Sequence, residues 1–162
     1  MPAGPTYSTM GTGSLAGVSE FIFSSIPSTY TDLVLIGANI TRSVANSVLM
    51  QFNGDTSASY AQIRMTGTGS AGSSYEDTGN AYVFLAALQN GLSNTPTNFR
   101  ADIFGYTSDQ YKTVFSKETD SGVNVNFACN SWSGTSAITS IRVFAAGNFT
   151  TGTVSLYGIA AA

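Results

Sequence analysis

The sequence predicts an all-β protein: an antiparallel β-sandwich, jelly-roll-like, with about nine to eleven strands. Short runs of alternating apolar and polar residues recur along the chain, and this period of two is typical of half-buried strands. Gly, Asn, Ser and Thr separate the runs, and no segment has a convincing helical pattern. Strands without crossover helices form antiparallel sheets, so two packed sheets are expected, with a closed barrel as the alternative.

A length of 162 residues favours one domain with a sizeable core. Residues 1–12 are rich in proline and glycine and read as an N-terminal extended arm or an irregular first strand. Such an arm lies on a neighbouring subunit or is a loose terminus. Residues 13–162 form the expected single β-sandwich domain.

The first strand of this domain is expected at Val18–Ser24, followed by a proline-containing turn at Ile26–Asp32. Leu33–Ile36 is apolar on both faces, which indicates a central strand covered on both sides. Val48–Phe52 and Tyr60–Thr66 are predicted to pair as a hairpin, because Asn53-Gly54 is a strong hairpin signal.

The segment Gly67–Asn80 is predicted to be a long loop, because it is dominated by small and polar residues. Tyr82–Leu88 is a buried strand or one to two helical turns, and its β-prone aromatic and branched residues favour the strand. The later strands are expected at 98–105, 110–118, 123–132, 138–145 and 154–159, with turns at 120–122 and 147–152.

The clearest alternation lies in Val123–Trp132. Its odd positions from Val123 to Cys129 are apolar and are predicted to be buried, with Asn124, Asn126 and Asn130 on the opposite face. Trp132 falls out of phase and is expected to face solvent, the other sheet or a partner.

Cys129 is the single cysteine, so no intrachain disulfide can form. Its phase within this strand predicts a small buried hydrophobic residue rather than a reactive thiol or an intersubunit bridge.

Charge is scarce. Asp, Glu, Lys and Arg make up 9% of the chain, against about 25% in ordinary soluble domains, so repulsion between copies is weak. The chain is therefore a neutral, Ser/Thr/Asn-coated monomer or, as we favour, a subunit whose surfaces are used in an assembly. Its six basic residues are scattered and its net charge is −3, which argues against nucleic-acid and anionic-membrane partners.

The absence of histidine excludes Ser-His-Asp and Cys-His catalysis and histidine-based zinc sites, and one cysteine cannot build a thiolate metal site. A paired-carboxylate glycosidase remains formally possible. Most of the nine acids fall in predicted turns, so we expect no enzyme and assign no catalytic, cofactor-binding or metal residue. These acids are Glu20, Asp32, Asp55, Glu76, Asp77, Asp102, Asp109, Glu118 and Asp120.

Two weaker possibilities concern ligands. Asp109, Glu118 and Asp120 bracket one expected hairpin, and Asn53 with Asp55 occupies another turn, so turn carboxylates could bind calcium. No EF-hand spacing is present, and solvated turn acids are the favoured reading.

Sugar-stacking aromatics are the second possibility, with Trp132, Tyr60, Tyr75 and Tyr106 as candidates. Aromatic residues also dominate cores and subunit interfaces, so stacking alone is weak evidence.

The N-terminus lacks the basic start and apolar stretch of a signal peptide, and no run approaches the roughly 20 apolar residues of a membrane span. We therefore expect synthesis and folding in a cytoplasm.

Several blocks resemble a known family. They include Pro2–Tyr7, Phe23–Pro27 followed by Tyr30–Leu35, Phe52–Asp55 with Ser59-Tyr60, and Gly147–Ile159. In these blocks the chain is similar to small β-rich virion structural proteins of tailed phages, of the cyanophage and marine-phage type. The resemblance implies a non-enzymatic particle protein of the head, tail or fibre. No site residue is carried over, because the shared blocks are turns and core strands.

The resulting expectation is a capsid decoration or cement protein that stabilises the head by binding across capsid subunits. It would act as a homotrimer in the virion, assembled in the host cytoplasm, with the major capsid protein or a tail component as partner. The alternative is a tail- or fibre-associated host-recognition module that binds cell-surface glycans. A polysaccharide hydrolase is the third possibility.

Overall fold

The computed structural model describes residues 6–44, 46–86, 95–120 and 124–160. Over these residues the protein is all-β, with twelve strands in two antiparallel sheets and no helix. The fold class predicted from the sequence is confirmed, although the strand number slightly exceeds the expected range.

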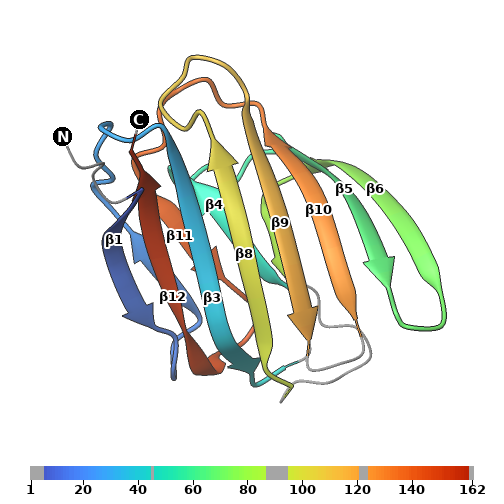
Figure 1. Cartoon of the computed structure of the whole chain (residues 1–162). Helices are drawn as coiled ribbons and strands as arrows, with labels where there is room; N and C mark the ends of the chain where they lie inside the picture. Colours follow the sequence, from blue (N-terminus) through green and yellow to red (C-terminus); the bar gives the residue numbers. More distant parts are fainter. Residues whose placement is uncertain (1–5, 45, 87–94, 121–123, 161–162) are drawn as a thin grey trace.

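The large sheet has eight strands in the order β1-β12-β3-β8-β9-β10-β5-β6. Figure 1 shows this sheet in front, with β5 and β6 at its right-hand end. The strands are β1 (Tyr7–Ser14), β3 (Asp32–Arg42), β5 (Tyr60–Gly67), β6 (Gly72–Asn80), β8 (Thr97–Phe104), β9 (Lys112–Asp120), β10 (Val125–Trp132) and β12 (Phe149–Ile159).

The small sheet lies behind the large one and has the order β2-β11-β4-β7 (Figure 1). Its strands are β2 (Glu20–Phe23), β4 (Val48–Phe52), β7 (Val83–Ala86) and β11 (Ile141–Phe144).

The chain path is that of a jelly roll with two insertions. Without β5, β6, β9 and β10, eight strands remain: β1, β3, β8 and β12 in the large sheet and β2, β4, β7 and β11 in the small one. Successive strands change sheet at every step except from β4 to β7, which pair with each other. This crossing from sheet to sheet is the double-sheet arrangement of a jelly roll. The two inserted hairpins, β5–β6 and β9–β10, extend the large sheet on one side as four adjacent strands.

The core lies between the sheets and is built from alternating residues of both inner faces. Leu35, Ile103 and Leu156 come from the large sheet, and Met50 and Val143 come from the small one; each is almost completely buried. The expectation that Leu33–Ile36 is a central strand agrees with β3, whose Leu33, Val34 and Leu35 have no exposed surface.

The N-terminal residues from Tyr7 onward do not leave the domain. They form β1, which pairs with β12 and has a register irregularity between Thr9 and Gly11. This is the irregular first strand considered as an alternative to an arm, while residues 1–5 lie outside the described residues.

The predicted hairpin between Val48–Phe52 and Tyr60–Thr66 is wrong. β4 belongs to the small sheet, where it pairs with β11 and β7, and β5 belongs to the large sheet, where it pairs with β10 and β6. Asn53 and Gly54 do take the positive φ angles that the turn signal predicts. The turn is therefore real, but the segment after it crosses from one sheet to the other.

The predicted loop at Gly67–Asn80 is also wrong, because Gly72–Asn80 forms the edge strand β6. Most of β6 is exposed on both faces, so its sequence carries no apolar alternation that would reveal a strand.

Tyr82–Leu88 was expected to be a strand, and β7 confirms this for Val83–Ala86, whereas Leu88 lies outside the described residues. β12 begins at Phe149 and therefore includes part of the turn expected at 147–152.

The largest correction concerns the face of β10 that is buried. Asn124, Asn126 and Asn130 point inward, while Val125 and Phe127 are half exposed. Cys129 is exposed as well, so its prediction as a buried residue is wrong. Trp132 faces inward, toward the other sheet, with 3% of its surface exposed.

The physical reason is the edge strand β7, which packs against the inner face of β9 and β10. The Phe84 amide donates to Asn130 Oδ1 at 3.2 Å, and Ser116 Oγ donates to the Phe84 carbonyl at 2.8 Å. A buried edge strand needs partners for its free backbone groups. Beside β7, the inward-facing residues of these strands therefore include Ser116, Asn126 and Asn130, and the large apolar residues Phe115, Val125 and Phe127 face outward.

Candidate interaction surface

The most unusual surface of the protein is the outer face of the inserted strands and the adjoining β8. Six large hydrophobic side chains here are each 43–61% exposed. We call this set the apolar face; it consists of Ile63, Met65, Phe104, Phe115, Val125 and Phe127.

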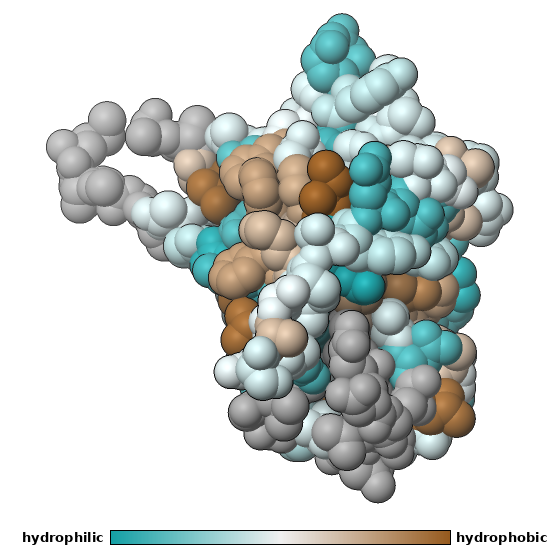
Figure 2. All heavy atoms as spheres, turned by 90° about the vertical axis from the view of Figure 1, so that its right-hand side faces the viewer, coloured by the Kyte–Doolittle hydropathy of each residue, from teal (hydrophilic) through white to brown (hydrophobic). Residues whose placement is uncertain are grey.

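The apolar face is continuous across four strands. Phe127 of β10 lies opposite Met65 of β5, and Cys129 lies between Ile63 on one side and Phe115 on the other. The Phe115 ring packs edge-on against Phe104, with ring centroids 6.0 Å apart. Figure 2, viewed from the β6 side, shows hydrophobic atoms at the surface on its left, where the outer face of the large sheet lies.

The exposed area is large for a monomer. A large hydrophobic side chain has a surface on the order of 200 Å², so six that are half exposed leave roughly 600 Å² of apolar surface. The largest apolar patch on a typical monomer is about 300–600 Å² and is often functional. The apolar face is therefore at the upper end of that range.

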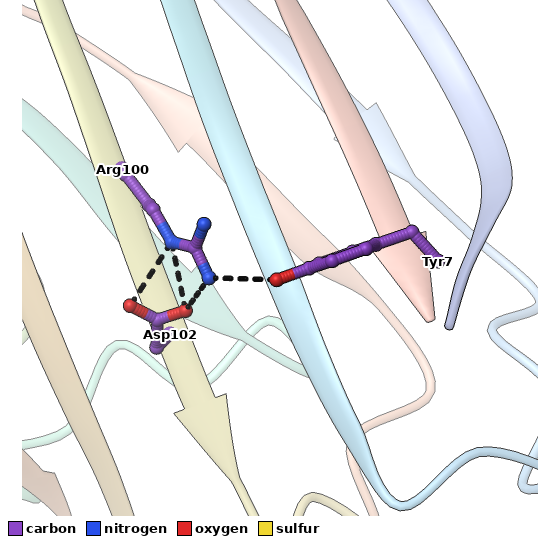
Figure 3. Close-up of polar contacts among 3 residues, drawn as sticks. All are labelled: Tyr7, Arg100 and Asp102. Atoms are coloured by element: carbon purple, nitrogen blue, oxygen red, sulfur yellow. Dashed lines mark hydrogen bonds and ion pairs between the residues drawn. The ribbon is translucent and has the colours of Figure 1, made fainter. Parts of the chain in front are cut away.

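Charged residues on this outer face are few, and two of them pair with each other. Arg100 forms an ion pair with Asp102 two positions along β8, with Nη2 and Oδ1 2.6 Å apart. Arg100 also donates to the Tyr7 hydroxyl at 3.3 Å, and Figure 3 shows its guanidinium between these two partners. The hydrogen bonds to Asp102 and Tyr7 raise the pKa of Arg100 above its ordinary value.

The acids considered for calcium are not brought together. Asp109 lies before β9 and Glu118 near its other end, so at about 3.3 Å per residue they are roughly 20 Å or more apart. Glu118 is buried on the inner face and accepts a hydrogen bond from Asn126 Nδ2. Nothing is described for the Asp120 side chain.

Asp55 has a structural environment. Its carboxylate accepts hydrogen bonds from Ser57, from Ser59 Oγ at 2.6 Å and from Trp132 Nε1 at 2.7 Å. Partial burial opposes the charged form, but these hydrogen bonds outweigh it and hold the pKa of Asp55 well below its usual value. Asp55 thus fixes the β4–β5 connection against Trp132.

Other acids also have local partners. Glu20 forms an ion pair with Arg142, and Asp32 accepts the Gly105 amide at 2.7 Å. In the described part of the chain, no three His, Cys, Asp or Glu residues gather closely enough to hold a metal ion.

Of the four candidate stacking aromatics, three are core residues. Tyr60, Tyr106 and Trp132 are almost fully buried, and burial raises the pKa of Tyr60 to about 12. The Tyr60 and Trp132 rings stack, with centroids 6.3 Å apart. Only Tyr75, on β6, is accessible to a ligand.

Tyr75 lines a small polar pocket on the inner side of the β5–β6 hairpin, together with Arg64, Asp77 and Tyr82. The Arg64 guanidinium carbon lies 5.0 Å from the Tyr75 ring centroid and 4.4 Å from that of Phe84. The two rings hold the cation in place by cation–π contacts. No carboxylate among the described residues forms an ion pair with Arg64.

Sequence reasoning recognised the strands of the apolar face but assigned Val125 and Phe127 of β10 to the buried side. One available signal was the polar set opposite them: Gln62 and Thr66 on β5, Ser116 on β9, and Asn126 and Asn130 on β10 share the other face. A face of amides and hydroxyls in three adjacent strands indicates buried hydrogen bonding as readily as solvent exposure.

Comparisons with known proteins found no matching family model, no matching curated protein and no matching solved structure. The part of the chain that the structure describes contains no helix that could span a bilayer.

Proposed function

We propose that this chain is a structural subunit of a tailed-phage virion, and specifically a decoration or cement protein of the capsid. The observation that carries the proposal is the apolar face, because a patch of this size on a soluble chain marks an interaction surface. The resemblance of several sequence blocks to small virion proteins is the reason for proposing that this surface is used in a phage particle. The scarcity of charge fits a surface that is covered after assembly.

The role is mechanical. At about 25 cal/mol per Å², covering roughly 600 Å² of apolar surface contributes on the order of 15 kcal/mol before the cost of association. Contacts of this strength between neighbouring subunits oppose expansion of a shell under pressure from packaged DNA. The partners proposed are copies of this chain and the major capsid protein or a tail component. The homotrimer expected from the sequence stays a prediction.

The proposal is tested on purified virions. We expect mass spectrometry to detect the protein in stoichiometric amount and electron cryomicroscopy to place it on the head. Particles assembled with Phe127→Ser should lose their DNA at a lower temperature than wild-type particles. Ile22→Ser is the matched control, because Ile22 is 51% exposed but lies on the small sheet. Absence of the protein from virions would rule out the proposed role.

A second candidate function, glycan recognition by a tail-associated module, is favoured by one observation. The pocket at Arg64 combines an accessible tyrosine with a fixed cation, which suits an acidic sugar, and the Asp77 carboxylate can accept hydrogen bonds from sugar hydroxyls. A glycan array with and without calcium tests it, with Tyr75→Ala against the exposed control Tyr111→Ala. Binding that Tyr75→Ala abolishes would support recognition, and no binding in either condition would exclude it.

A further inference from the structure

Two neighbouring rows of side chains cross the outer face, and one of them is basic. Arg100 on β8 lies opposite Lys117 on β9, and Lys117 lies opposite Phe127 on β10. The row continues to Met65 on β5. We call it the basic row.

The next row is acidic. Asp102 on β8 lies opposite Phe115 on β9, which lies opposite Cys129 on β10. Cys129 lies opposite Ile63, and Ile63 lies opposite Glu76 on the edge strand β6. This acidic row is two residues from the basic row along every strand.

This arrangement is self-complementary. Consider a two-fold axis that is parallel to the sheet, perpendicular to the strands and midway between the two rows. This axis places the basic row of one copy against the acidic row of another. Arg100 then faces Asp102 of the partner subunit, and the same contact forms a second time by symmetry. We infer that two copies of this chain pair face to face through the apolar face, with these rows setting the register.

The hydrophobic residues also match in this register. Met65 lies opposite Ile63 of the partner subunit, and Phe127 lies opposite the partner's Cys129. Lys117 lies over the ring of the partner's Phe115, which is a favourable cation–π arrangement. Like charges do not meet within the two rows, so the pairing is free of the repulsion that other registers would introduce.

The size of the surface fits a second copy. Roughly 600 Å² of apolar area, extended by the charged ends of the rows, approaches the about 800 Å² per partner of a standard interface. Two sheets pack face to face at about 10 Å, and the interface would be symmetric. When one self-complementary face pairs with itself, the assembly is complete with two copies. The inferred dimer therefore differs from the homotrimer expected from the sequence.

The first experiment measures molecular mass against concentration by sedimentation equilibrium. We expect a reversible monomer–dimer equilibrium. Phe127→Ser should raise its Kd roughly 30-fold, the change expected for an interface hot spot. The control Ile22→Ser should leave Kd unchanged. A wild-type protein that stays monomeric, a trimer, or an assembly that Phe127→Ser leaves intact would overturn the inference.

A charge-exchange experiment tests the register. In the R100E homodimer two pairs of carboxylates face each other, and in the D102R homodimer two pairs of guanidinium groups do. Both homodimers should be weaker than wild type. In the mixed dimer both pairs are again opposite in charge, so mixing the variants should restore dimerisation. Failure of the mixture to dimerise, with both variants folded by circular dichroism, would rule out this register.

The inference rests on the proposed role as an assembly subunit, but the two can fail separately. A protein found on virions that is monomeric in solution would keep the proposed function and overturn the pairing. A protein that dimerises in solution but is absent from virions would keep the pairing and overturn the proposed function.

Discussion

Single residues in this protein act mainly by holding backbone and aromatic groups in place. Asp55 is the clearest case, because one carboxylate holds the connection between the two sheets and the indole of Trp132. The Tyr60 hydroxyl accepts from the Phe52 amide at 3.0 Å in the same region. Together they fix the point at which the chain leaves β4 for the other sheet.

We predict that Asp55→Ala destabilises the fold by about 1–3 kcal/mol, because it leaves the Trp132 N–H and both serines without their acceptor. Asp109→Ala is the control, since Asp109 is exposed and, among the described residues, its carboxylate accepts a side-chain hydrogen bond from its neighbour Gln110 alone. Its effect should stay within about 0.5 kcal/mol. Urea unfolding at pH 7 measures both, and equal values would contradict the role of Asp55.

The same contacts predict a pH dependence. The pKa of Asp55 is lowered on folding, so below about pH 4 the unfolded chain binds a proton that the native protein still excludes. The stabilisation by Asp55 is full above that pH and is lost as the pH falls toward the native pKa. The difference in free energy of unfolding between wild type and Asp55→Ala should therefore become smaller from pH 5 to pH 3. A difference that stays constant over this range would contradict the lowered pKa of Asp55.

Cys129 lies within the apolar face, so the reactivity of its thiol measures whether that face is covered. Because its side chain is exposed in the single chain, a maleimide should label it in the native protein without denaturant. If two copies pair through this face, the labelling rate should fall as protein concentration rises through the Kd. Phe127→Ser should remove that concentration dependence, and a rate independent of concentration in wild type would count against pairing.

At the scale of elements, β7 and the inserted hairpin β9–β10 depend on each other. β7 is the edge of the small sheet, and the hairpin supplies Asn130 and Ser116 to its backbone. In return, β7 covers the polar inner face of the hairpin. This exchange explains why Phe115, Val125 and Phe127 of the hairpin lie on the outer face.

We predict that Asn130→Ala costs about 1–3 kcal/mol, because the buried Phe84 amide loses its acceptor. The adjacent Ser131→Ala changes an exposed residue of the same strand and should cost less than about 0.5 kcal/mol. Denaturant unfolding gives the free energies, and amide hydrogen exchange should show loss of protection at Phe84 in the first variant alone. Unchanged protection there would contradict the proposed partnership.

The same exchange explains why the local prediction for β10 was wrong while the strand itself was correct. The alternation in Val125–Trp132 indicates that the two faces of the strand differ in polarity. It does not indicate which of the two faces is buried by the rest of the protein. For Leu33–Leu35, apolar residues on both faces left no such ambiguity, and that prediction was confirmed.

At the scale of the whole molecule, the protein is a jelly roll whose large sheet has been widened. The eight jelly-roll strands supply most of the core, and the inserted hairpins add Tyr60, Val114 and Trp132 to it and carry most of the apolar face. The residues of the apolar face point away from this core, so they can change without loss of the core. Phe127→Ser is consequently expected to leave thermal stability near that of wild type.

The proposed pairing combines many apolar contacts with two symmetric charge pairs, which predicts a weak dependence on salt. Salt screens exposed ion pairs but does not weaken apolar burial. Between low salt and about 1 M NaCl, where the Debye length is roughly 3 Å, we expect the Kd to change by less than about tenfold. A much steeper dependence, measured by sedimentation, would mean that charge rather than the apolar face drives association.

The all-β class of the chain follows from the amino-acid sequence, because period-two alternation and turn residues are local properties. The sequence also located most strands, although the polar edge strand β6 escaped detection because neither of its faces is buried. Two features became visible only in the folded protein: β4 and β5 lie in different sheets, and the asparagines of β10 face inward. Those outcomes depend on contacts between distant segments, such as Phe84 with Asn130, and no local pattern encodes such a contact.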